Sequence, residues 1–232
     1  MENLNVLYED NQIIVVIKPH NIPTQADESK DKDLLSMVKE YVKVKYEKKG
    51  EAYIGMVQRL DRPTGGIVVF ARTSKSANRL CEQLKDNTFH KTYYAIVDGV
   101  PKQKTGVLVN YLKKDSKTNK VTIVPALESG AKKAELEYKL LETNGKESLL
   151  EIQIKTGRSH QIRVQLSNIG LPICGDAKYN KNVKNFSNNM SLWAGKVNFV
   201  HPVSKDKLVF MVCPDTTSTA WNKFYIDKYF TR

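Results

Sequence analysis

The chain has 232 residues, of which 41% are hydrophobic and 27% are charged, and this composition excludes extended disorder and a fibrous repeat. Its 37 Lys and Arg residues against 25 Asp and Glu give a net charge of +12, which favours a polyanionic partner because neutralised phosphates release counterions. The apolar runs at residues 13–17 and 67–71 are strand-sized, far below the ~20 residues of a membrane-spanning helix, so no membrane association is expected.

Strands and helices alternate in the first half of the chain. Residues 13–17, "IIVVI", predict a fully apolar strand. Asp33 predicts the N-cap of an amphipathic helix that ends at Gly50. A second strand, residues 67–71, precedes a helix that Thr73 or the following serine caps.

The second half is predicted to be mostly strands. Alternating or apolar runs place strands at residues 91–97, 106–112, 121–127, 134–142, 149–156 and 207–213. The stretch "GRSHQIRVQLSNIGLP" predicts one short helix. In that helix Ser159 is the expected N-cap, Ile162, Leu166 and Ile169 are the expected buried residues, and Gly170 follows the last turn.

Cysteine and histidine positions bear on the compartment and on metal binding. The three cysteines are far apart and odd in number, which argues against a disulfide framework and fits a reducing compartment. The N-terminus has no basic segment followed by an apolar core. None of the four histidines pairs with a cysteine or an acid at zinc-ligand spacing. We therefore expect a cytoplasmic protein without a metal site.

Three polar stretches lie at the ends of predicted elements: "QRLDRPTGG", "KTYYAIV" and "GRSHQIR". In the first, Asp61 lies between Arg59 and Arg62 at a turn that leads into a strand. A surface ion pair alone could explain that acid, since exposed Arg/Asp pairs are common. A tyrosine on a strand is usually a core residue, and an arginine on a short helix is usually solvated. The three stretches in this order are far more specific than any one of them.

With these motifs the chain resembles the RluA-type pseudouridine synthases, which convert uridines in RNA to pseudouridine without a cofactor. The resemblance runs from "LYEDNQIIVVIKPHNIPT" to "HPVSKDKLVFMVCP" and covers nearly the whole chain. It implies an α+β pseudouridine synthase fold, with a mixed, largely antiparallel central sheet, flanking helices and a central active-site cleft. It also implies a single catalytic domain over residues 1–232 without a separate N-terminal RNA-binding module.

The resemblance implies a role for each matching residue. The catalytic aspartate falls on Asp61, the stacking tyrosine on Tyr93, and the arginine that pairs with the catalytic carboxylate on Arg163. The implied RNA-binding residues are Arg59, which fills the stack when the target base leaves it, and Arg62, Arg158 and His160. These roles make physical sense, because base extrusion costs a few kcal/mol, stacking on an aromatic ring returns ~1 to 3 kcal/mol, and a guanidinium favours an ionised carboxylate.

Several alternatives stay open from the sequence. Asp61 is expected to act as nucleophile or base, by attack on the ribose, attack on the base or removal of the 2′ proton. Gln58 and Gly65 stand where many family members have histidine and serine. The substrate is ribosomal or transfer RNA, and a monomer is expected. The rival functions are a noncatalytic RNA-binding or ribosome-assembly factor of the same fold and a base-excising hydrolase.

Overall fold

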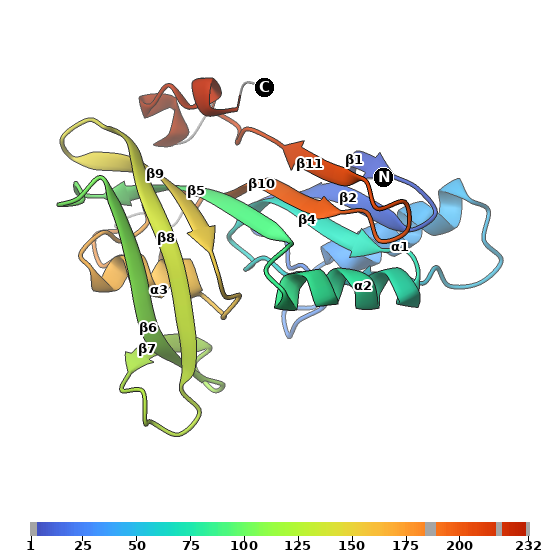
Figure 1. The fold of residues 1–232 in the computed structure, drawn as a ribbon, viewed down its shortest axis with the longest axis horizontal. Helices are drawn as coiled ribbons and strands as arrows, with labels where there is room; N and C mark the ends of the chain where they lie inside the picture. The colour runs from blue at the N-terminus through green and yellow to red at the C-terminus, as the bar shows by residue number, and fades with distance from the viewer. Residues whose placement is uncertain (1–3, 184–188, 217–219, 231–232) are drawn as a thin grey trace. The chain divides into compact units, whose positions relative to one another are not determined.

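A computed structural model describes residues 4–183, 189–216 and 220–230 (Figure 1). The chain divides into two compact units. Unit 1 comprises Met1–His90 and Ala194–Val212, and unit 2 comprises Lys91–Trp193 and Cys213–Arg232. A single catalytic domain over the whole chain stays a prediction.

Unit 1 is built around a sheet with two helices. Its elements are β1 (Asn5–Glu9), β2 (Ile13–Lys18), α1 (Leu34–Lys45), β3 (Gly55–Met56), β4 (Gly65–Ala71), α2 (Ser74–Lys85), β10 (Leu192–Val200, from Ala194 onward) and β11 (Lys207–Met211). The strand order is β1-β2-β4-β10, while β11 pairs with β10 and β3 with β4. The sequence predicted β2 and β4 as continuous apolar runs, and β4 is buried throughout, as expected for strands that are covered on both faces. α2 packs against β4 (Figure 1).

The N-caps of both helices in unit 1 are confirmed. Asp33 Oδ1 accepts a hydrogen bond from the Ser36 amide at 3.1 Å, and Thr73 Oγ1 accepts one from the Ser76 amide at 3.1 Å. The predicted end of α1 at Gly50 is wrong, because the helix ends at Lys45. Glu47 adopts a left-handed conformation with φ 48°, which turns the chain away before the glycine is reached.

In its described residues, unit 2 contains a long sheet and one α-helix. Its elements are β5 (His90–Asp98, from Lys91 onward), β6 (Thr105–Asp115), β7 (Lys120–Val124), β8 (Lys132–Thr143), β9 (Glu147–Ile154), α3 (Gln161–Asn168) and two 3-10 turns (Ala220–Lys223 and Ile226–Tyr229). The strand order is β5-β9-β8-β6-β7, and each of these pairings is antiparallel. The predicted α+β architecture with a largely antiparallel sheet is confirmed.

α3 covers the β6–β7 end of the unit 2 sheet. Val164 packs there in a core cluster with Leu112, Val121 and Ala134. The side-chain amide of the fully buried Gln165 donates to the Leu108 carbonyl at 3.1 Å. The helix that carries Arg163 is therefore fixed by both apolar and polar contacts. In the described ranges, none of the helices has the length and apolar character that crossing a bilayer requires.

Candidate active site

The half-buried Asp61 lies in the segment 57–64 that connects β3 to β4. The Thr64 amide donates to the Asp61 carbonyl at 2.9 Å and closes a turn. On the other side, the buried Thr24 contacts both main-chain groups of Leu60: its Oγ1 donates to the carbonyl at 2.8 Å and accepts from the amide at 3.1 Å. The backbone before and after Asp61 is therefore fixed by hydrogen bonds.

Lys18 is a fully buried lysine next to this segment. Its Nζ donates to the carbonyl oxygens of Pro19 at 2.9 Å, Ile22 at 2.6 Å and Arg62 at 2.9 Å. Burial lowers the pKa of Lys18 to about 7, and the charge of Asp61 acts in the opposite direction. An ammonium has three donors, so the three carbonyls satisfy it. Lys18 thus fixes the residue after Asp61 and brings a positive charge near the carboxylate.

The two glycines after Asp61 start β4 directly. Gly66 has φ +120°, and a Cβ at this position would overlap the main chain of Ala194. Only glycine fits both restrictions. Gln58, where many family members have histidine, is buried and donates to the Ile67 carbonyl at 3.4 Å. In this chain Gln58 therefore contributes to packing around the turn.

Arg59 and Arg62 both have exposed side chains. Arg62 donates to Ser29 Oγ at 2.8 Å, pairs with Asp31, and lies 3.9 Å from Asp27. The acidic segment 27–31 thus neutralises part of the charge of Arg62. An RNA-binding role for either arginine stays a prediction.

Tyr93 lies on β5 opposite Ile152 of β9, and its exposed fraction is only 6%. Pairing of β5 with β9 and this burial fix the ring by packing. Lys91, two residues earlier, belongs to the same face, because side chains alternate along a strand.

Arg163 lies on α3 and is 5% exposed. Its guanidinium makes two parallel contacts with Asp176, from Nε to Oδ2 at 2.8 Å and from Nη2 to Oδ1 at 2.8 Å. It also lies over the ring of Tyr179, 5.1 Å from the centroid. Asp176 Oδ1 accepts the amides of Lys178 and Tyr179 as well. Within unit 2 the partner of Arg163 is therefore Asp176, and the pairing with Asp61 stays a prediction.

The predicted N-cap of α3 is wrong. The cap is His160, with a left-handed φ of 50°, rather than Ser159. The side chain of Gln161 instead fixes the loop before the helix, because its Oε1 accepts from the Arg158 amide at 3.1 Å and from Thr156 Oγ1 at 2.7 Å. Ile169, predicted to be buried, is 40% exposed, since the helix ends one residue earlier.

The side chains of Arg158 and His160 differ in exposure and in partners. Arg158 is exposed, and its Nε donates to the Lys133 carbonyl at 3.0 Å. The half-buried His160 has Nδ1 2.8 Å from Tyr179 Oη. The same hydroxyl accepts the Val121 amide at 2.8 Å, so Tyr179 links the start of α3 to β7.

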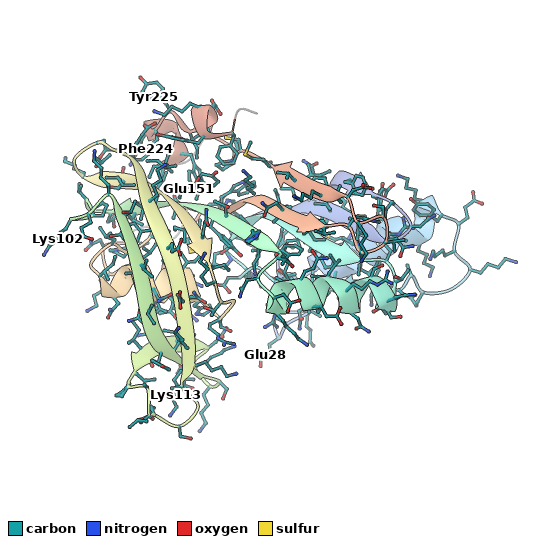
Figure 2. All side chains as sticks on the ribbon, in the orientation of Figure 1. Glu28, Lys102, Lys113, Glu151, Phe224 and Tyr225 are labelled. Atoms are coloured by element: carbon teal, nitrogen blue, oxygen red, sulfur yellow. The ribbon has the colours of Figure 1, made fainter. Side chains whose placement is uncertain are left out.

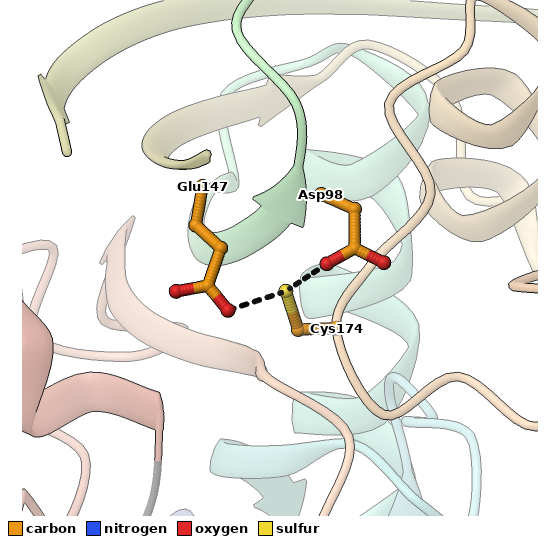
Figure 3. A group of neighbouring side chains, drawn as sticks. All are labelled: Asp98, Glu147 and Cys174. Carbon is orange, nitrogen blue, oxygen red and sulfur yellow. Dashed lines mark hydrogen bonds between the residues drawn. The ribbon is translucent and has the colours of Figure 1, made fainter. Parts of the chain in front are cut away.

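Among the residues that the structure describes, one group of side chains could hold a metal ion: Asp98, Glu147 and Cys174 (Figure 3). The thiol donates to Asp98 Oδ1 at 3.1 Å, and Lys223 Nζ contacts both oxygens of Glu147 at 2.7 and 2.8 Å. Burial and the two carboxylates raise the pKa of Cys174. A metal ion would have to displace both the thiol proton and the ammonium, so these hydrogen bonds account for the group.

Comparisons with known proteins agree with these motifs. The sequence model of the RNA pseudouridylate synthase family matches residues 12–168. An uncharacterized RNA pseudouridine synthase of Bacillus subtilis is 34% identical over 210 residues, which are 89% of this chain and 67% of that protein. The ribosomal large subunit pseudouridine synthase C of Buchnera aphidicola is 31% identical over 212 residues, or 88% and 65% of the two chains.

A solved structure shows the same fold. The human RNA pseudouridylate synthase domain containing 4 superimposes with a TM-score of 0.77 at 22% identity, over 91% of this chain and 88% of that one. The chain spans about two thirds or less of the length of the curated relatives it matches. By the family match and the identity to these relatives, the chain belongs to the RNA pseudouridine synthase family.

Proposed function

We propose that this protein isomerises uridines in RNA to pseudouridine. The observation that carries the proposal is the family match over residues 12–168, with the aspartate of the "RLD" motif on a fixed turn. Some relatives are named ribosomal large subunit pseudouridine synthases, which favours ribosomal RNA over transfer RNA as the substrate.

The reaction rearranges bonds without a redox change. The bond between N1 of uracil and C1′ of ribose breaks, and a bond between C5 and C1′ forms. The hydrogen on C5 leaves as a proton, and N1 gains a proton. In this proposal the carboxylate of Asp61 starts the exchange as nucleophile or base, so it has to be ionised.

The remaining groups receive the extruded nucleotide. Tyr93 offers a ring face for stacking, and Arg163 stabilises the ionised carboxylate. Arg59 takes the place of the extruded base in the RNA stack. We also propose a reducing compartment, which the three unpaired cysteines fit, and a monomer as the acting form.

Tritium release tests the proposal directly. RNA is taken from cells that lack the gene and were grown with uridine carrying tritium on C5, so that the natural target is unmodified. Incubation with the protein should release tritium to water and yield pseudouridine. Free uracil would instead indicate a hydrolase, and binding without turnover a noncatalytic RNA-binding factor; either result would overturn the proposal.

The matched variant is Asp61→Asn, which keeps the size of the side chain. It should abolish tritium release while the thermal unfolding midpoint and RNA binding stay close to the wild-type values. The hydrogen bonds that fix this turn involve the main chain of residues 60, 62 and 64 and not the Asp61 side chain. The variant therefore leaves these hydrogen bonds in place. Retained turnover would refute the role of Asp61.

A further inference from the structure

Lys91 is a lysine in a largely covered position, and the part of the chain that the structure describes offers it no partner. It lies at the start of β5 in unit 2, and its residue is only partly exposed. Among the residues that the structure describes, none forms a hydrogen bond or an ion pair with its ammonium group. Burial alone lowers the pKa of Lys91 to about 8. A partly dehydrated charge without a counter-charge is costly. The contacts within the protein therefore do not explain why a lysine occupies this position, two residues before Tyr93.

The ammonium group lies against the loop that leads into α3. Nζ is 3.8 Å from the position that a Cβ on Gly157 would occupy. Gly157 is exposed and has no side chain, so solvent and ligands can approach the loop there. The next residue, Arg158, uses its Nε for the Lys133 carbonyl. In the described part of the chain, the two terminal nitrogens of Arg158 have no partner.

We propose that Lys91 binds a phosphate group of the RNA strand next to the uridine that stacks on Tyr93. The inference rests on the proposed function and adds a substrate contact that the sequence motifs did not indicate. Lys91 and Tyr93 share one face of β5, so a nucleotide stacked on the ring brings its backbone near the ammonium. A lysine acts on phosphate as a compact point charge, and Arg158 on the adjacent loop adds donors for the same strand.

A purely structural lysine gives the opposite signature. Removing a lysine that stabilises the fold lowers the unfolding midpoint, whereas removing an uncompensated buried charge leaves it unchanged or raises it. The proposal therefore predicts weaker RNA binding together with equal or higher thermal stability. This combination separates a ligand contact from a packing role.

The test compares Lys91→Met with Lys102→Met, which removes the same charge from an exposed loop between β5 and β6 (Figure 2). The probe is a fluorescein-labelled RNA hairpin with a loop of uridines, and anisotropy gives the affinity at several salt concentrations. Loss of one phosphate contact reduces the slope of log affinity against log salt by about 0.7 to 0.9. If the two proteins bind equally at 1 M salt, this difference in slope makes Lys91→Met bind about five- to eightfold more weakly than the wild-type protein at 0.1 M salt. Lys102→Met should change the slope far less.

Two further measurements keep the outcome decisive. Lys91→Arg should retain the wild-type salt slope because it keeps the charge, and Lys91→Met should unfold at the wild-type temperature or above. An unchanged slope for Lys91→Met, or a clearly lowered midpoint, would overturn the role of Lys91. Tritium release by the wild-type protein is measured alongside. If it is absent, the proposed function fails; if it is present, the salt slope and the midpoint decide the role of Lys91 separately.

Discussion

Asp61 and Arg163 carry opposite charges and lie in different units, and the chain fixes them in different ways. Around Asp61, Thr24 and Lys18 contact the main chain of the flanking residues. Arg163 is fixed through its own guanidinium, by the buried carboxylate of Asp176. A change of the Asp61 side chain is therefore expected to spare the fold, whereas a change at either end of the Arg163–Asp176 pair alters both stability and chemistry.

The largest effect is expected for Asp176→Asn, which removes the buried carboxylate that pairs with the guanidinium of Arg163. Side-chain exposures of 6% and 0% place the pair in the interior, where loss of one partner costs about 3–5 kcal/mol. The free energy of unfolding, measured by urea titration, should fall by that amount. Turnover should also fall, because the position of Arg163 is no longer fixed.

The matched control is Glu128→Gln, which breaks the Lys113–Glu128 pair in the same unit. Its N–O distance of 2.7 Å is as short as that of the buried pair, but both side chains are more than 40% exposed. The expected loss is below about 1 kcal/mol. Equal losses in the two variants would mean that burial does not distinguish the pairs, and the comparison would fail.

A smaller effect is expected for Thr24→Val, which keeps the side-chain shape and removes the hydroxyl. The amide and carbonyl of Leu60 would both lose their contact with Oγ1, at a cost of about 1–3 kcal/mol. Because Leu60 precedes Asp61, kcat should fall as well. The control, Thr122→Val at an exposed position on β7, should change neither quantity. A variant with normal stability and normal kcat would show that Thr24 does not fix the turn.

The sequence predicted β2, β4, β11, the strands of unit 2 and the helix caps at Asp33 and Thr73, because hydrophobic period and local capping residues determine these features. It did not predict β1, β3 or β10. The residues proposed to react follow from the family resemblance and stay predictions. The sequence did not predict the residues that fix them. Asp176 becomes the partner of Arg163 only when the chain after α3 turns back, and no local pattern reports such a pairing. In the sequence Lys18 is the polar residue at the end of an apolar strand. This position does not indicate that its side chain is fully buried in the structure.

The wrong predictions of the start of α3 and the end of α1 also arise because residue type alone does not decide where a helix begins or ends. Ser159 is a good N-cap residue by type, but the side chain of Gln161 reaches back to the Arg158 amide and Thr156, so the helix starts after His160. Gly50 suits a helix end, but a left-handed Glu47 ends α1 earlier. Propensity identifies residues that can end a helix, and tertiary contacts select among them.

The smallest effect concerns the pH dependence of the Asp61 turn. His20 Nδ1 lies 2.7 Å from the Pro63 carbonyl, and since a carbonyl only accepts, Nδ1 carries a hydrogen. Burial lowers the pKa of His20 below its ordinary value, and the charge of Lys18 lowers it further. The neutral ring already donates to Pro63. Below about pH 6.5 the His20 imidazole is therefore protonated more readily in the unfolded chain than in the folded chain. The free energy of unfolding consequently falls as the pH falls.

His20→Asn tests this sign, because its amide can replace the Nδ1 donor and does not titrate. Urea unfolding of both proteins at pH 7 and pH 5 should show that the wild-type protein loses more stability than the variant as the pH falls. His201, which pairs with Asp10 at 2.9 Å, is present in both proteins and cancels in the difference. A wild-type protein that gains stability relative to the variant at pH 5 would mean that protonated His20 is favoured. The turn after Asp61 would then be stabilised by a charge rather than by a neutral hydrogen bond.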